Sequence, residues 1–151
     1  MVTEATPRQP TPQPRRCGIA DALGVVGERW SLLAVREISL GVHRFSQIAA
    51  NTGAARDILT ARLRTLEGLG VVERRQYSER PPRFEYQLTA AGWALMPVLH
   101  ALREWGDDWL NDDPPMLFDH SCGEIFHPQT HCRACGEPLR RGSLLMHRGQ
   151  P

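Results

Sequence analysis

The segment from residue 56 to residue 70 constrains the fold of this chain more than any other. Leu59, Leu63 and Leu66 recur there at intervals of four and three residues, which places their side chains on one face of an α-helix. The opposite face carries polar and small residues: Asp57, Thr60, Ala61, Arg64 and Gly68. The pattern predicts an amphipathic helix with its leucines in a core and its polar face free to bind. We expect Thr52 or Gly53 to cap its start, and Gly68 and Gly70 to end it.

Shorter helices are predicted before this segment. The apolar spacing between residues 19 and 38 predicts two helices, because Gly24 and Gly27 interrupt the pattern. Residues 45–49 predict a third short helix, which ends at the Asn-Thr-Gly sequence of residues 51–53.

A hairpin and a long helix are predicted after it. Residues 71–72 and 84–88 predict two β-strands, joined by a polar, proline-containing tip at residues 78–83. Thr89 is expected to cap a helix that runs to about residue 110 and is kinked by Pro97. Together these elements predict a mainly α fold with a small β-hairpin, in the order of a winged helix-turn-helix. In that fold the short helix and the tight turn position the amphipathic helix to enter the major groove of DNA.

Charge is distributed unevenly along the chain. All 18 basic residues are arginines, and residues 44–83 hold eight of them against four acidic residues. Residues 103–119, by contrast, hold one arginine and six acidic residues. A basic segment attracts the phosphates of double-stranded DNA, so the candidate DNA-binding residues come from this part of the chain. They are Arg44, Ser46, Arg56, Asp57, Thr60, Ala61, Arg64, Arg80 and Arg83.

The same part of the chain carries a family resemblance. Four motifs resemble the HxlR-type regulators, bacterial winged-helix transcription factors related to the MarR type: Gly27-Glu28-Arg29-Trp30, Arg44-Phe45, Leu59-Thr60-Ala61-Arg62-Leu63 and Pro82-Arg83-Phe84-Glu85-Tyr86-Gln87-Leu88-Thr89. The resemblance covers residues 17–110. It implies a DNA-binding homodimer without enzymatic activity, with its recognition helix at residues 56–69 and its wing at residues 78–83.

The resemblance also implies how the chain dimerises. Dimer contacts of the family fall here on residues 19–26 and 91–110. Trp105 and Trp109 are candidate anchors of that contact, or they complete the core of the monomer.

The segment after residue 112 holds three of the four cysteines. His120-Ser-Cys122-Gly and Cys132-Arg-Ala-Cys135-Gly resemble the two halves of a small zinc ribbon, because a structural zinc site is closed by four nitrogen or sulfur ligands. The predicted ligands are His120, Cys122, Cys132 and Cys135, with His127 and His131 as alternatives to His120. The other interpretations are a disordered tail or a redox pair formed by Cys132 and Cys135.

Cys17 is a candidate redox sensor. Arg15, Arg16 and the start of a helix just after Cys17 all favour the thiolate over the thiol. Members of the resembling family often place a cysteine here, and some use it to sense oxidants. The alternative is an inert cysteine tucked under the first helix.

These patterns divide the chain into three parts: a proline-rich disordered arm at residues 1–16, the winged helix-turn-helix at residues 17–112 and the Cys/His tail at residues 113–151. The sequence has neither a membrane-length apolar run nor a signal-peptide pattern, so we expect a cytoplasmic protein without membrane contact. The predicted function is sequence-specific regulation of transcription, responsive to thiol chemistry or an unknown effector. The alternatives are a zinc-ribbon adaptor that does not bind DNA and a thiol-redox enzyme that uses Cys132 and Cys135.

Overall fold

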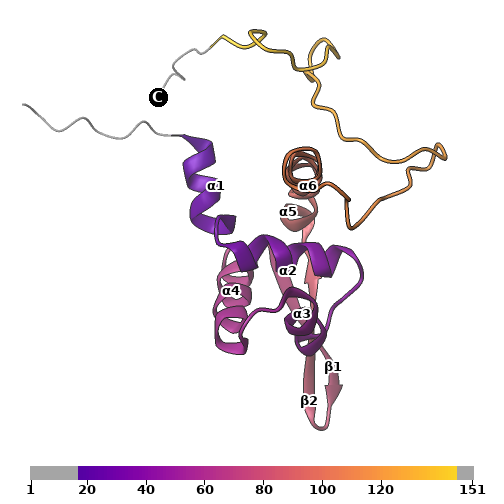
Figure 1. The fold of residues 1–151 in the computed structure, drawn as a ribbon. Coiled ribbons are helices and arrows are strands. Elements are labelled where there is room, and N and C mark those ends of the chain that lie inside the picture. Colours follow the sequence, from indigo (N-terminus) through magenta and orange to yellow (C-terminus); the bar gives the residue numbers. More distant parts are fainter. Residues whose placement is uncertain (1–16, 146–151) are drawn as a thin grey trace, which may run out of the picture.

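Residues 17–145 are described by the structure, a computed structural model. This part of the chain contains six helices and one two-stranded antiparallel sheet (Figure 1). The elements are α1 (Gly18–Val26), α2 (Arg29–Ser39), α3 (Phe45–Thr52), α4 (Arg56–Gly68), β1 (Val72–Glu79), β2 (Pro82–Leu88), α5 (Ala90–Trp93) and α6 (Met96–Leu110). They form a winged helix-turn-helix, which confirms the predicted fold class. The predicted arm at residues 1–16 lies outside the described residues. Within residues 17–145, no helix is long and apolar enough to cross a membrane.

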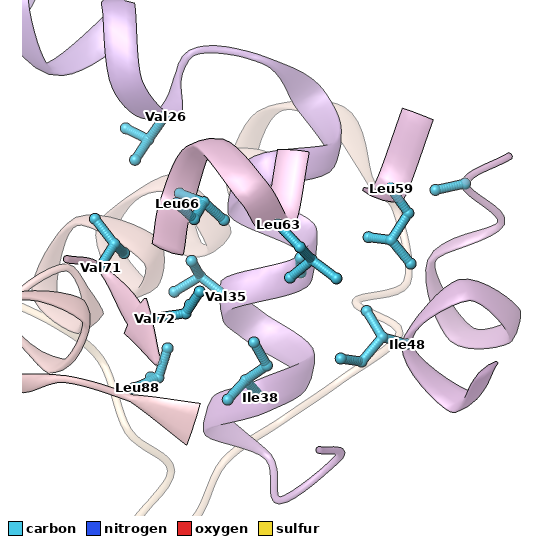
Figure 2. Packing of buried hydrophobic residues seen from close by; sticks show 12 residues of the cluster. Val26, Val35, Ile38, Ile48, Leu59, Leu63, Leu66, Val71, Val72 and Leu88 are labelled. Carbon is cyan, nitrogen blue, oxygen red and sulfur yellow. The ribbon is translucent and has the colours of Figure 1, made fainter. Parts of the chain in front are cut away.

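The core is formed by one face of α4 together with α2, α3 and the base of the hairpin (Figure 2). Leu59, Leu63 and Leu66 of α4 are completely buried, as their spacing predicts, and belong to the same cluster as Val35 and Ile38 of α2. Burying one leucine side chain stabilises a fold by roughly 1.5–3 kcal/mol. The three leucines therefore fix the rotation of α4 about its own axis.

The break between the first two helices falls at Gly27. A Cβ at this position would collide with the backbone oxygen of Leu23, so only glycine lets the chain leave α1 at this angle. Gly24, which was also expected to interrupt the helices, lies inside α1, and that part of the prediction was wrong. Nothing lies within 4 Å of where its Cβ would be, so the position has no steric requirement for glycine.

The turn between α3 and α4 consists of three residues. Gly53 takes the left-handed conformation, with φ of 72°, and caps the end of α3, a role that glycine fills without strain. The N-cap of α4 is Ala55, so the prediction of Thr52 or Gly53 was wrong. Thr52 belongs to α3 instead, where its hydroxyl donates to the backbone oxygen of Ile48 at 2.7 Å.

A buried carboxylate joins α2 to the end of α3. Glu37 is only 5% exposed, and one of its oxygens accepts a hydrogen bond of 2.7 Å from the side-chain amide of Asn51. The other oxygen accepts bonds of 2.9 and 2.6 Å from the guanidinium of the adjacent Arg36. A buried charge is tolerated when it is paired and hydrogen-bonded. Here the bond to Asn51 holds the last turn of α3 against α2.

The two strands are longer than the sequence predicts. Residues 78–83 were expected to form a loop, yet Ser78 pairs with Arg83 and Glu79 with Pro82, so that the strands continue almost to the tip. The register shifts between Gln76 and Ser78. Most side chains in this outer part are exposed, and a strand without a buried face shows no apolar alternation in the sequence.

The hairpin is attached to the helical part of the domain by His43, which lies just before α3. The backbone N–H of Tyr86 donates to the backbone oxygen of His43 at 2.8 Å. Nδ1 of His43 lies 2.9 Å from the backbone oxygen of the same tyrosine. Both backbone groups of one residue of β2 are thus bound to one residue of the helix-turn-helix.

The predicted single helix after the hairpin is two helices. As expected, the hydroxyl of Thr89 accepts a hydrogen bond, 3.3 Å long, from the N–H of Gly92. The chain then breaks between α5 and α6 instead of kinking within one helix at Pro97. Pro97 lies in the first turn of α6, where the missing N–H has no helical partner in any case. The expected kink at Pro97 was therefore wrong.

We predict that Gly92→Ala destabilises the domain. A Cβ at Gly92 would collide with the backbone oxygen of Val71 and crowd the side chain of Leu88, so α5 would be pushed off the hairpin. Overpacking of this kind costs about 1–3 kcal/mol, measurable as a lower free energy of unfolding in urea. The matched control is Gly68→Ala in the last turn of α4, where a Cβ meets nothing within 4 Å. Equal losses in both variants would contradict this account.

Candidate nucleic-acid interface

The outer face of α4 carries the predicted DNA-binding residues. Arg56, Asp57, Ala61 and Arg64 are exposed, and Thr60 is half-buried beside them. All five lie outside the face that buries Leu59, Leu63 and Leu66. Their positions on one exposed face are confirmed, and their contact with DNA stays a prediction.

Thr60 has a restricted hydrogen-bonding capacity. Its hydroxyl donates to the backbone oxygen of Arg56 at 2.7 Å, so the oxygen is left as an acceptor and the methyl group as an apolar contact. In the major groove such a side chain fits the amino group of adenine or cytosine and the methyl group of thymine. Thr60 therefore complements the arginines on either side of it, which act only as donors.

Two arginines stack on aromatic rings at the joints between elements. The guanidinium of Arg56 lies 5.1 Å from the ring centre of Phe45, which connects the start of α4 with the start of α3. The guanidinium of Arg44, at the N-cap of α3, lies 5.2 Å from the ring centre of Tyr77 in β1. Cation–π contacts hold a guanidinium in place while its N–H groups stay free at the edge. The predicted residue Ser46 is exposed in the first turn of α3, next to these stacks.

The hairpin adds more positive charge than the sequence analysis assigned to it. Arg80 and Arg83 are exposed near the tip, as predicted. Arg74 and Arg75 of β1 are exposed as well, and both were missed because residues 73–77 were not expected to form a strand. Arg74 stacks on Phe84 with 3.7 Å between the guanidinium and the ring centre. The hairpin thus carries arginines along β1 as well as near its tip.

The predicted metal ligands lie in two separate pairs. Nδ1 of His120 lies 3.2 Å from Sγ of Cys122, and Cys132 lies close to Cys135. Among residues 17–145, no three His, Cys, Asp or Glu side chains lie close enough together to hold a metal ion. The zinc site therefore stays a prediction.

The two alternative ligands in the tail are engaged elsewhere. Nδ1 of His127 lies 2.8 Å from a carboxylate oxygen of Glu104 in α6. Nδ1 of His131 lies 3.2 Å from the backbone oxygen of Gln129. This arrangement favours His120 over His127 and His131 as a partner of the cysteines.

The tail packs against α6, which the sequence analysis did not predict. The guanidinium of Arg103 donates to the backbone oxygens of Met116 and Phe126 at 3.3 and 3.0 Å. The ring of His100 meets the rings of Phe118 and Phe126 edge-on, with ring centres 5.4 and 5.1 Å apart. Burial, together with the charge of Arg103, lowers the pKa of His100, which favours the neutral imidazole that such packing requires.

A cavity of about 780 Å³ lies where α2, α5, α6 and the tail meet. Its walls are mainly apolar, with Leu40, Trp93, Met96 and Phe118 among the lining residues. Ser39, His100 and Arg103 supply polar groups. A cavity of this size and polarity is typical of sites for small apolar ligands.

Cys17, the candidate redox sensor, is the N-cap of α1. It is exposed and carries a free thiol, as do Cys122, Cys132 and Cys135. The alternative of an inert cysteine tucked under the first helix does not fit this exposure. Arg15 and Arg16, which were expected to activate the thiol, lie outside the described residues.

The fold and the arginine-bearing face of α4 define a winged helix-turn-helix protein, and comparisons with known proteins identify its family. The model of the HxlR-like helix-turn-helix family matches residues 25–114. The HTH-type transcriptional regulator MT3179 of Mycobacterium tuberculosis is 45% identical over 124 residues, which cover 80% of this chain and 78% of the relative. The chain therefore belongs to the HxlR-like helix-turn-helix family, a family of DNA-binding transcriptional regulators.

Two solved structures extend this comparison. PA1607, described as a candidate transcription factor, is 34% identical and superposes with a TM-score of 0.78, covering 88% of this chain and 95% of its own. The redox regulator HypR in its oxidised form is 31% identical, with a TM-score of 0.56 over 61% of this chain and 96% of its own. The chain is thus similar in fold to a protein described as a redox regulator.

Proposed function

We propose that this protein is a sequence-specific DNA-binding regulator of transcription that acts in the cytoplasm as a homodimer. One observation carries the proposal. The buried leucines of α4 hold its opposite face outward, so that Arg56 and Arg64 are presented together. Membership of a regulator family supports the same conclusion.

In this proposal α4 enters the major groove. Arg64 is in the middle of the exposed face, where a guanidinium can donate two hydrogen bonds to O6 and N7 of guanine. Arg80 and Arg83 of the hairpin reach the phosphates of the flanking DNA. Contacts with bases give specificity, whereas contacts with phosphates give affinity that does not depend on sequence.

The exposure of α6 supports a homodimer. None of the residues Met96–Leu110 is buried, although a helix of this length gains most of its stability from packing. Figure 1 places α1 and α6 on the opposite side of α2 from α3 and the hairpin tip. The side chains left exposed on these two helices include Ile19, Leu23, Val98, Leu102, Trp105, Trp109 and Leu110.

A second copy of the chain fits this apolar surface. Trp105 and Trp109 are 54% and 73% exposed, so they do not complete the core of the monomer, which was the alternative interpretation of these residues. Pairing through α1 and α6 buries them in a symmetric contact. The contact leaves both copies of α4 free to bind DNA.

The position of Cys17 supports a thiol response. It is exposed at the N-cap of α1, a helix that we place in the dimer contact. A change of its oxidation state would alter how the two copies meet, and thereby the distance between the two α4 helices. HypR, a neighbour in structure, is itself a redox regulator.

The alternative of a thiol-redox enzyme has less support. Redox-active C-x-x-C motifs normally open a helix within a βαβ unit. Cys132 and Cys135 lie in a turn instead, and within residues 17–145 the strands form one hairpin. The adaptor that does not bind DNA remains the second alternative, and the first experiment below distinguishes it.

We expect the dimer to bind a pseudo-palindrome whose half-sites lie about one helical turn, or about 34 Å, apart. Arg64→Ala should weaken binding to the selected site by about 1–3 kcal/mol and relax specificity at one base pair. Arg83→Ala should weaken binding to all sequences alike and reduce the salt slope by about one. Titrations of selected and scrambled duplexes at several salt concentrations would measure both effects.

The matched control is Arg140→Ala, an exposed arginine of the tail outside the proposed interface, which should leave all these values unchanged. If the protein is an adaptor that does not bind DNA, no DNA sequence should be selected, and Arg64→Ala should change no measured DNA affinity. Affinity that does not change with salt would contradict the proposed phosphate contacts.

We expect the purified protein to have twice the mass of one chain in sedimentation and light-scattering measurements. Replacing Leu102 and Trp109 together by Glu should yield monomers, because four carboxylates per dimer would then have to be buried in an apolar contact. Both side chains are exposed in one chain, so the fold should persist. Leu144→Glu, at an exposed apolar position in the tail, is the control. A double variant that stays dimeric would refute the assigned contact.

We expect an oxidant of thiols such as diamide to change the affinity of the wild-type protein for its selected DNA site. Without diamide, Cys17→Ser should bind the selected DNA site as tightly as the reduced wild-type protein does. After addition of diamide, its affinity should not change. Arg140→Ala, which leaves every cysteine in place, serves as the control and should respond as the wild type does. If Cys17→Ser and the wild type respond identically, Cys17 is not the sensor.

A further inference from the structure

The tail contains two turns of the same construction. In the first, the N–H of His120 donates to the oxygen of Glu124 at 2.8 Å, and the N–H of Gly123 donates to the oxygen of His120 at 2.9 Å. In the second, the N–H of Cys132 donates to the oxygen of Glu137 at 2.8 Å, and the N–H of Gly136 donates to the oxygen of Cys132 at 2.8 Å. In each turn, both backbone bonds involve the first of the two predicted ligands, which is His120 in one turn and Cys132 in the other.

The backbone conformation at the end of each turn requires a glycine. Gly123 and Gly136 follow directly after Cys122 and Cys135, and their φ angles are 95° and 74°. A residue with a Cβ is strained in this conformation. The positive φ turns the chain immediately after Cys122 and Cys135, the second predicted ligand of each turn.

The two predicted ligands of each turn lie next to each other. In the first turn, Sγ of Cys122 lies 3.2 Å from Nδ1 of His120, and the backbone N–H of Cys122 lies 3.3 Å from the same nitrogen. In the second turn, Cys132 lies close to Cys135.

The tail has little else to hold it together. Within residues 119–145 only Phe126, Pro128 and Pro138 are partly buried, and the other side chains are exposed. Two short hairpins without an apolar core need a metal or a partner to be stable. The first turn has a partner, because Phe126 is bound to Arg103 and packs on His100 of α6. The second turn is joined to it by the nine residues between Cys122 and Cys132.

We propose that the two turns are the two halves of one structural zinc site, with His120, Cys122, Cys132 and Cys135 as its four ligands. In this structure the halves are apart, so binding requires the second turn to move onto the first, which α6 holds in place. Three sulfurs and one imidazole nitrogen are a donor set that zinc binds tetrahedrally in closed structural sites. The three thiols lose their protons on binding, and no electrons are transferred.

The similarity to a known relative continues into the tail. The match to MT3179 spans 124 residues, more than the 112 that precede the predicted tail, so it includes part of the tail. The proposal does not depend on DNA binding, because none of its ligands belongs to α4 or the hairpin. A failure of one proposal would therefore leave the other intact.

The test is elemental analysis of the full-length protein, purified without chelators and in the presence of a phosphine reductant. About one zinc per chain is expected. Cys122→Ser and Cys132→Ser, which remove one ligand from each half, should both lose most of this zinc. Cys17→Ser and His131→Ala should retain it. Cobalt in place of zinc should give the intense visible absorption of tetrahedral thiolate coordination, and the same two ligand variants should abolish it.

Hydrogen exchange of the wild-type protein distinguishes one joint site from two independent ones. Removing the metal should increase amide exchange in both turns at once, while exchange in the buried residues of α4 stays unchanged. Metal content that responds to Cys132→Ser but not to Cys122→Ser would overturn the joint site. Protein that contains no zinc and takes up neither zinc nor cobalt would overturn the proposal altogether.

Discussion

Burial of the leucine face of α4 against α2 is the interaction on which the rest of the domain depends. Successive residues of a helix are turned by about 100° about its axis, so a shift of the buried face by one residue would turn Arg64 toward the core. The complete burial of Leu59, Leu63 and Leu66 excludes that alternative. The hydrogen bond between Glu37 and Asn51 holds the last turn of α3 against α2. The three-residue turn that follows keeps α4 close to α3. The orientation of the polar face thus follows from apolar packing on the opposite side.

Those parts of the fold that have a periodic buried face could be predicted from the sequence. The spacing of the leucines identified α4 and its exposed side, and the order of the elements identified the winged helix-turn-helix. Thr89 was recognised as a cap because Ser, Thr, Asp and Asn are preferred at that position, although the same preference failed at Thr52. The candidate residues of α4 could be named for the same reason, since exposure on a helix with one buried face follows from position alone.

The features that escaped prediction are those set by contacts between distant residues or by an exposed backbone. The outer half of the hairpin has no buried face, so the length of its strands and the arginines of β1 left no pattern in the sequence. The close approach of Gly92 in α5 to the backbone of Val71 joins residues that are far apart in the chain. The contact of His100 and Arg103 with the tail joins residues that are far apart in the chain. None of these contacts leaves a signal at short spacing.

The attachment of the hairpin at His43 has a consequence for the length of DNA that one chain can read. Because both backbone groups of Tyr86 are bound to His43, two residues before α3, these contacts oppose movement of the hairpin relative to the helix-turn-helix. In the proposed complex with DNA, the distance between the groove that α4 would enter and the backbone that the hairpin would contact is then fixed by the protein. If a single base pair were inserted between these two contacts, the duplex rather than the protein would have to deform. The spacing between the two contacts should therefore characterise a binding site as much as its base sequence does.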